Sequence, residues 1–396
     1  MTQSTDWAPP RQTPIAWLRQ NLFSSWLNSV ITLVLVAAIA AIIGRLGFWI
    51  TTEARWTVLV DNWTLFFVGR YPAAEQWRLW LWLVLLSPTL GLTWGCLATE
   101  SYRWRRRSLW GWALFAAAIV LIPLPWWPHK LGLTAIAAGV LATSWFAQRC
   151  RGQGWLRFLP SLWGILFLVG LWILQGGLGL RPVSSNDWSG LLLTLATALL
   201  SMVLSLPVGI VLALGRQSTL PAIRWLSITY IELFRGLPLI TILFFGQVMV
   251  PLMLDAEWRI DRVLRAVIGL TIFLSAYLAE TVRGGLQAIP HGQFEAASAL
   301  GLNLFQTYRF IVLPQALRIS IPAIVGLFLN LLQDTTLLSI VGLLELLGIS
   351  RSILANPAYL GRYAEVYLFL GVLYWLCCYG LAQLSRRLEQ RLTPQR

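Results

Sequence analysis

Residues 189–214 read SGLLLTLATALLSMVLSLPVGIVLAL, a run of 26 residues without a charged side chain. An α-helix rises about 1.5 Å per residue, so roughly 20 apolar residues cross the hydrocarbon core of a bilayer, which is about 30 Å thick. This run is long enough and apolar enough to predict a transmembrane helix.

The composition of the whole chain extends that conclusion. Of 396 residues, 57% are hydrophobic and 12% are charged, and the mean hydropathy is +0.68. The charged share is about half that of a soluble globular domain, which leaves too little polar surface to cover even one domain in water. The net charge of +14 does not indicate a nucleic-acid-binding protein, because 29 of the 30 basic residues are Arg and lie in short clusters between apolar runs. We expect lipid to be the main solvent.

Apolar runs of membrane-spanning length recur along the chain. We expect an all-α integral membrane protein with about ten transmembrane helices, at residues 27–50, 79–98, 109–128, 131–148, 158–176, 189–214, 237–254, 264–282, 319–333 and 364–385. Eight or nine spans are the alternative, because the third and fourth runs are nearly continuous and the ninth is short and contains Pro322.

The charges between the runs predict the orientation, because cytoplasmic segments are enriched in Arg and Lys. With the N-terminus inside and ten spans, the segments between spans hold 19 basic and 5 acidic residues on the inside, but 9 basic and 9 acidic residues on the outside. This asymmetry favours a multi-pass protein with both termini in the cytoplasm.

One change in composition divides the chain. Trp and Arg are concentrated before residue 190, and a Gly-rich turn at 175–179 and a polar stretch at 184–187 precede the run quoted above. We therefore expect an N-terminal extension of about five spans at 1–188 and a second domain at 189–390.

The sequence carries no motif for a metal ion or a nucleotide. The four cysteines lack CxxC spacing and a neighbouring His, so we expect inert thiols and no metal site. There is no Gly-x4-Gly-Lys-Ser/Thr loop, so the chain is not expected to hydrolyse ATP or to be an enzyme.

A long inside segment at 284–318 separates two of the predicted spans. A hairpin between spans needs only a few residues, so about 35 residues suggest a function of their own. We expect a short helix from Gln293 to Leu300, an end at Gly301, a second short helix to Phe310, and a turn back toward the membrane at Pro314. The small side chains of the first helix would allow another protein to approach closely.

The spacing within this segment resembles a known signature. Glu295-Ala296-Ala297, then Gly301, then Ile311-Val312-Leu313-Pro314 is similar to the cytoplasmic-loop motif of permease subunits of binding-protein-dependent ABC importers. The polar amino-acid group of these permeases is indicated by Arg235-Gly236-Leu237-Pro238 and by residues 276–285. Gln333-Asp334-Thr335-Thr336-Leu337 and Glu345-Leu346-Leu347-Gly348 resemble the general L-amino-acid permeases, which also have an extended N-terminal half. One departure is Gln333, where such permeases often have Lys.

The resemblance implies a function and a set of partners. It implies a C-terminal five-helix permease core and import of amino acids across the bacterial inner membrane, driven by ATP and Mg on two separate ATPase subunits. It also implies a second permease subunit, in a heterodimer, and a periplasmic or extracellular amino-acid-binding protein. The residues expected to couple the permease to the ATPase are Glu295, Ala296, Ala297, Gly301, Leu313 and Pro314. Ordinary helix packing is the alternative role for the two alanines.

Two acid–arginine pairs lie near the ends of predicted spans. Glu232 and Arg235 are three residues apart, as are Glu280 and Arg283, and this spacing places both members on one side of a helix. We expect ion pairs at a cytoplasmic gate, and the alternative is that they only fix helix packing.

A polar stretch follows the short ninth run and is the candidate substrate path. A bound amino acid presents a carboxylate and an ammonium group, which suit amide, hydroxyl and carboxylate side chains at a helix break in the membrane. These residues are Asn330, Gln333, Asp334, Thr335 and Thr336. The alternative is that they cap an amphipathic helix at 337–348.

Two other classes of function are weighed against the importer. An ion-coupled secondary amino-acid transporter would have a similar number of helices, but it would more often place acids or His deep within its spans. A membrane-embedded transferase acting on lipid-linked donors would need reactive groups in large outside loops, and the charged loop at 255–262 is short.

Overall fold

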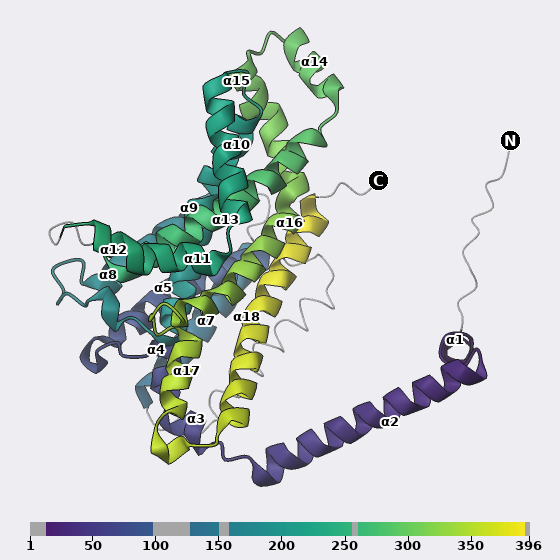
Figure 1. Cartoon of the computed structure of the whole chain (residues 1–396), viewed down its shortest axis with the longest axis vertical. Helices are drawn as coiled ribbons and strands as arrows, with labels where there is room; N and C mark the ends of the chain where they lie inside the picture. Colours follow the sequence, from purple (N-terminus) through teal and green to yellow (C-terminus); the bar gives the residue numbers. More distant parts are fainter. Residues whose placement is uncertain (1–12, 98–126, 150–157, 256–259, 393–396) are drawn as a thin grey trace. The chain divides into compact units, whose positions relative to one another are not determined.

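The computed structural model describes residues 13–97, 127–149, 158–255 and 260–392 (Figure 1). Every named element in these ranges is a helix, which confirms the all-α fold. The chain divides into two compact units, residues 1–60 and 61–396. The boundary predicted at residue 188 is not where these units divide, since helices on both sides of it belong to the second unit.

The described part of the first unit contains α1 (Pro14–Asn21), α2 (Trp26–Phe48) and most of the short helix α3 (Thr57–Asp61). The Ser25 side chain accepts a hydrogen bond from Asn28 N and caps the start of α2. A π-helical turn, Trp49–Glu53, extends α2 to a 28-residue apolar helix. Helix α2 confirms the span predicted at 27–50 by its length and apolar composition.

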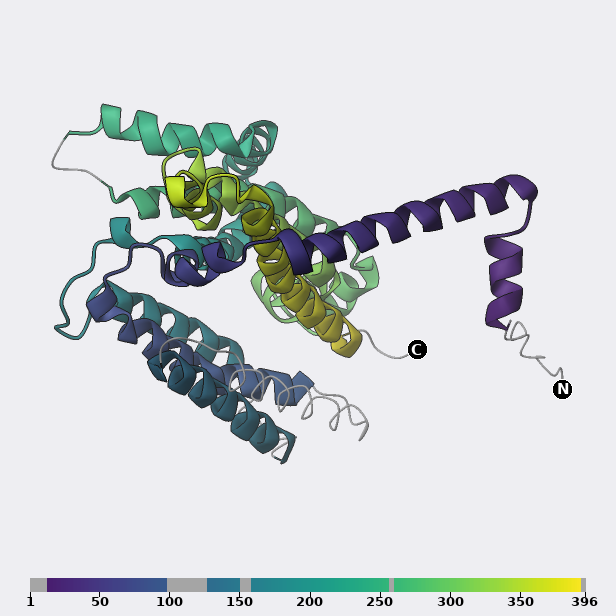
Figure 2. The same cartoon turned by 90° about the horizontal axis from the view of Figure 1, so that it is seen from below.

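The second unit begins with the short helix α4 (Trp63–Val68) and a bundle of α5 (Trp77–Leu97), α7 (Trp127–Arg149) and α8 (Leu159–Gln175). Helix α5 packs closely on α7, and the two run alongside each other in Figure 2 (blue). Small residues permit this approach, because a Cβ on Gly95 would lie 2.5 Å from Ser144 O. These helices match the spans predicted at 79–98, 131–148 and 158–176.

Helix α13 (Arg262–Gln287) is at the centre of the C-terminal half. It packs against α9 (Gly190–Arg216), α10 (Pro221–Gly236) and α16 (Leu313–Asp334), and α16 packs against α18 (Tyr363–Leu392). Glycines allow these helices to approach closely: a Cβ on Gly285 would lie 2.5 Å from Ala316 O. The helices α9, α13 and α18 confirm the spans predicted at 189–214, 264–282 and 364–385.

The span predicted at 237–254 is not one continuous α-helix. It consists of α11 (Leu239–Phe244), a π-turn at Phe245–Met249 and α12 (Val250–Met253), and it bends by 102° from α10. Pro238 lacks a backbone N–H and favours an extended conformation for Leu237, so α10 ends here. Neither α10 nor this segment is long enough to span a membrane by itself, but the two together are.

The span predicted at 319–333 is longer than expected. A continuous helical segment of 36 residues, from Leu304 to Ser339, includes α15 (Leu304–Thr307), a π-turn at Tyr308–Val312 and α16. The turn predicted at Pro314 is therefore wrong. Pro314 directly follows the π-turn Tyr308–Val312, and the helical segment continues through it.

The count of ten spans is not reached in the described residues. Seven helices there are long and apolar enough to cross a membrane, or eight if the bent pair is one span. Helix α8, with 17 residues, falls just short of that length. The span predicted at 109–128 lies almost entirely outside the described residues.

Candidate functional site

Helix α14 (His291–Ala299) carries the Glu-Ala-Ala sequence and confirms the short helix predicted at 293–300. It lies near α15 at the end of the C-terminal half (Figure 1). Pro290 precedes its first turn, and it ends because Gly301 adopts φ +74°, a left-handed conformation that glycine tolerates best. Leu302 N then donates to Ala297 O at 3.1 Å, which closes the end of the helix.

The three motif residues of α14 do not share one environment. Glu295 and Ala296 are exposed, whereas Ala297 is fully buried within the chain. The expectation that Ala297 allows close approach of another protein is therefore wrong, because its small side chain packs inside the C-terminal half. Of the other coupling candidates, Pro314 is exposed and Leu313 is half-buried.

Helix α14 is tied to the helical segment that follows it. The rings of Phe294 and Tyr308 meet edge to face with centroids 5.9 Å apart. The Gln315 side-chain amide donates to Gln293 Oε1 at 3.2 Å. These two contacts join α14 to the π-turn Tyr308–Val312 and to the first turn of α16, so a displacement of α14 would be passed to α16.

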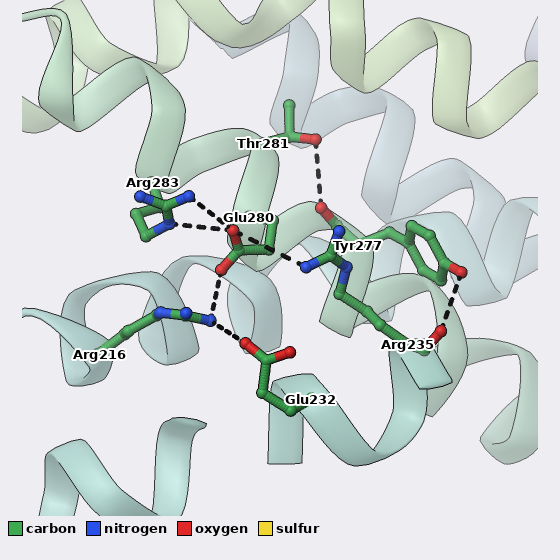
Figure 3. Close-up of polar contacts among 7 residues, drawn as sticks. All are labelled: Arg216, Glu232, Arg235, Tyr277, Glu280, Thr281 and Arg283. Carbon is green, nitrogen blue, oxygen red and sulfur yellow. Dashed lines mark hydrogen bonds and ion pairs between the residues drawn. The ribbon is translucent and has the colours of Figure 1, made fainter. Parts of the chain in front are cut away.

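Glu280 is the centre of a charged cluster formed by three helices (Figure 3). Arg216 at the end of α9 donates from Nη1 to Glu280 Oε1 at 2.7 Å. Arg283, on the same helix as Glu280, donates from Nε and Nη2 to Oε2 at 3.0 and 2.8 Å. The Glu280 side chain is 15% exposed, so three arginines share one largely buried carboxylate once Arg235, at 3.8 Å, is included.

The predicted pairs are therefore half right. The pair of Glu280 and Arg283 is confirmed, but the pair of Glu232 and Arg235 is wrong. Glu232 contacts Arg216 Nη1 at 2.9 Å, and Arg235 lies nearest Glu280 (Figure 3). The prediction failed because spacing within one helix does not reveal that Arg216 and Glu280, on other helices, offer closer partners.

The cluster lies beside the break between α10 and α11. The Tyr277 hydroxyl donates to Arg235 O at 3.4 Å, and the Arg235 guanidinium lies 5.5 Å from the centre of the Tyr277 ring. The carbonyls at the end of a helix lack partners within that helix, and Tyr277 supplies one here. The cluster thus connects α9, α10 and α13 where α10 ends.

The polar stretch at 330–336 does not form one convergent group. Asn330 and Gln333 are exposed, and Thr335 is buried with its hydroxyl donating to Leu332 O at 2.7 Å. Asp334 is half-buried, as is Thr336, whose hydroxyl donates to Gln333 O at 2.8 Å. Helix α16 does end at Asp334, as expected, and a 3-10 turn, Thr335–Ser339, follows it.

The helix expected at 337–348 begins later, as α17 (Leu346–Leu354), and its N-cap is Glu345. The Glu345 carboxylate accepts hydrogen bonds from Leu347 N at 2.8 Å and Gly348 N at 2.9 Å, and from the Tyr374 hydroxyl at 3.4 Å. Glu345 is fully buried, and this burial raises its pKa to about 7. Sequence reasoning did not select Glu345 as a site residue, although an acid between pairs of leucines was a usable signal.

Comparison with known proteins places this chain in a family. Residues 205–394 match the family described as "Binding-protein-dependent transport system inner membrane component". The inner membrane amino-acid ABC transporter permease protein YhdY of Escherichia coli is 35% identical over 388 residues, which cover 96% of this chain and 94% of YhdY. The chain belongs to the amino-acid ABC transporter permeases. It is thus a multi-pass protein of an inner-membrane family whose ATPase lies on partner proteins.

Two further relatives cover different shares of this chain. The glutamate/glutamine/aspartate/asparagine transport system permease protein BztC of Rhodobacter capsulatus is 34% identical and covers 98% of this chain and 97% of BztC. The probable glutamine ABC transporter permease protein GlnP of Bacillus subtilis is 37% identical but covers 52% of this chain and 93% of GlnP. The permease therefore shares its N-terminal half with YhdY and BztC. These names favour an ABC permease over an ion-coupled secondary transporter.

Proposed function

We propose that this permease imports polar amino acids into bacteria and that α14 is the helix through which the ATPase subunits drive it. The observation that carries the proposal is an exposed short helix that bears Glu295, ends at Gly301 and is tied to α16. The names of YhdY and BztC support amino acids as the substrate class.

The proposed coupling uses the contacts of α14. ATP and Mg bind to the two partner ATPase subunits, and this chain itself holds no cofactor. Closure of those subunits displaces α14, and the Phe294–Tyr308 and Gln293–Gln315 contacts pass the displacement to α16. Packed helices respond to such a displacement by moving as rigid bodies between discrete arrangements.

The Glu280 cluster is proposed as the gate at the cytoplasmic end of the core. Its carboxylate joins α9, α10 and α13 while the gate is closed, and a rigid-body movement of α10 separates Arg235 from it first, because that contact is the longest at 3.8 Å. The 330–336 stretch is proposed to line the substrate path, with exposed Asn330 and Gln333 available to a solute.

The proposed assembly contains four kinds of component. They are this chain, a second and different permease subunit, two ATPase subunits, and a soluble amino-acid-binding protein on the outer side. Both termini of this chain lie in the cytoplasm, because the charge asymmetry between segments favours that orientation.

The experiment that tests the function is uptake of radiolabelled amino acids by proteoliposomes that contain the purified complex, with binding protein outside and ATP inside. We expect uptake that requires ATP and is lost when the nucleotide-loop Lys of the ATPase is replaced by Ala. The Glu295→Lys complex should hydrolyse ATP yet take up at least tenfold less amino acid. Uptake by this chain alone under an ion gradient would contradict the proposal.

A further inference from the structure

The start of α9 is joined to the start of α17 by main-chain contacts. Gly190 N donates to Leu344 O at 2.9 Å, and Gly190 pairs with Glu345 as an isolated β-bridge. Leu346 N donates to the Thr194 hydroxyl at 3.1 Å. These contacts define the α9–α17 joint, which also contains the buried Glu345 carboxylate.

Main-chain atoms of the N-terminal extension lie directly on this joint. Gly190 has φ +64°, and a Cβ there would lie 2.7 Å from Phe66 O and 2.8 Å from Leu65 O. Both carbonyls belong to α4. Real Cβ atoms do not approach an oxygen so closely, so even a methyl group at position 190 would displace α4 from the joint.

The residue before Gly190 adds a second contact. The Ser189 hydroxyl accepts a hydrogen bond from Arg70 N at 2.7 Å, and Ser189 is 1% exposed. Gly69 adopts φ +59°, and a Cβ there would meet the Ser189 main chain at 2.6 Å. Two glycines with positive φ therefore allow two stretches of main chain to lie against each other.

The same part of the extension also contacts α17 and α18. The fully buried Phe66 ring meets Phe369 of α18 edge to face, with centroids 5.1 Å apart. The Tyr359 hydroxyl, in the turn after α17, donates to Asp61 Oδ2 at 3.1 Å. Residues 61–71, which we term the 61–71 segment, thus contact α9, α18 and the turn after α17, and α4 packs against α17 itself.

We propose that the 61–71 segment is a positioning element for transport: it holds the α9–α17 joint in place and thereby the end of the substrate path. The argument rests on the proposed function for its last step. Both α9 and α17 pack against the turn Thr335–Ser339, which follows the 330–336 stretch. A displaced joint would therefore move Thr335 and Thr336. Main-chain contacts without room for a methyl group fix a position more strictly than mobile side chains do.

The test is Gly190→Ala in the full-length chain, assembled with its partner subunits and assayed for ATP-driven uptake. We expect uptake per assembled complex to fall at least tenfold, because the new methyl group displaces α4. The matched control is Gly179→Ala. Gly179 has a similar φ of +76°, but no atom lies within 4 Å of its Cβ position, so this variant bears the backbone strain without the collision. We expect it to retain at least half of the uptake.

Equal uptake by the two glycine variants would overturn the proposal. So would a loss in Gly190→Ala that matched a loss of assembled complex, since that result indicates a purely structural role. Absence of ATP-driven uptake in the wild type would instead contradict the proposed function, and the joint is then tested by the exchange measurement below.

The second variant, Ser189→Ala, removes one hydrogen bond and leaves the fold little changed. Hydrogen exchange of the full-length protein should show at least tenfold faster exchange at Arg70 and also at residues 344–348, because loosening of the 61–71 segment reaches the joint. The control is Ser184→Ala. The Ser184 hydroxyl also accepts a hydrogen bond from a main-chain amide, Asn186 N, but it lies outside the 61–71 segment and its contacts. Unchanged exchange at 344–348 in Ser189→Ala would refute the positioning role.

Discussion

At the scale of single residues, Glu280 shows how one carboxylate can connect three helices. Its two oxygens accept hydrogen bonds from Arg216 and Arg283, and Arg235 lies at 3.8 Å. Hydrogen bonds between charged groups are stronger than neutral ones, and removing the Glu280 carboxylate leaves three partly exposed guanidinium groups close together. A substitution of Glu280 should therefore disturb the cluster more than a substitution of Glu232, which contacts Arg216.

We predict that Glu280→Gln lowers ATP-driven uptake at least tenfold and raises ATP hydrolysis in the absence of substrate. Three guanidinium groups lose their shared negative charge and one of the two acceptor oxygens, so the closed arrangement of α9, α10 and α13 is destabilised. Initial rates of uptake and of phosphate release from the same proteoliposomes measure both effects. Glu232→Gln is the control, because that side chain is 56% exposed and contacts only Arg216 in the cluster; it should change either rate less than threefold.

Glu345 gives a prediction about pH. Burial raises its pKa from the ordinary 4.5 to about 7. The hydrogen bonds that the carboxylate accepts and the nearby Arg351 lower the pKa, but by less than burial raises it. The folded chain therefore holds this proton more tightly than the unfolded chain. The contribution of Glu345 to the free energy of unfolding is complete below about pH 4.5. It decreases as the pH rises toward about 7 and changes no further above that.

The measurement is the thermal unfolding midpoint of the purified complex at several pH values between about 4.5 and 8. The wild type should lose stability as the pH rises, and Glu345→Gln, which cannot ionise, should lose at most half as much. Parallel curves for the two proteins would show that the Glu345 proton is not responsible.

At the scale of elements, α14 depends on a glycine for its end and on packing for its attachment. Gly301 has φ +74° and no atom within 4 Å of its Cβ position, so a substitution there is opposed by backbone conformation alone. Ala297, in contrast, is fully buried and is opposed by packing. The two motif positions should therefore tolerate different substitutions.

We predict a graded loss of uptake in the order Gly301→Asn, Gly301→Ala, Gly301→Val. Asn enters the left-handed region readily, whereas a β-branched residue is strongly disfavoured there, and the left-handed conformation costs most residues about 1–2 kcal/mol. Gly301→Asn should retain at least half of the wild-type uptake, and Gly301→Val less than a tenth, with equal amounts of chain in the membrane. Normal uptake by Gly301→Val would show that the conformation at the end of α14 plays no part in coupling.

Other elements show where sequence patterns were sufficient and where they were not. Helix α9 was predicted within two residues at each end because an uncharged apolar run of that length has few other stable conformations in lipid. The bend between α10 and α11 was missed, although Leu237-Pro238 could have indicated it. The turn expected at Pro314 failed because the helical segment changes to a π-turn at Tyr308–Val312, just before the proline, and continues through it.

At the scale of the whole molecule, most of the N-terminal extension belongs to the same compact unit as the permease core. The Trp and Arg content changes near residue 188, whereas the compact units divide after residue 60. The helices from residue 61 onward belong to the same unit as α9 and α13. YhdY and BztC match along nearly the whole chain, whereas GlnP covers 52% of it.

The sequence by itself determined the membrane-spanning character, the helical fold class, most of the spans and the family, because hydropathy and motif spacing are local properties of the chain. Only the tertiary structure decided the partners of Glu232 and Arg235, the burial of Ala297 and Glu345, and the contact of Gly190 with α4. Each of these joins residues on different helices. Their contacts follow from how the helices pack, and packing depends on shapes and distances that no spacing along the sequence records.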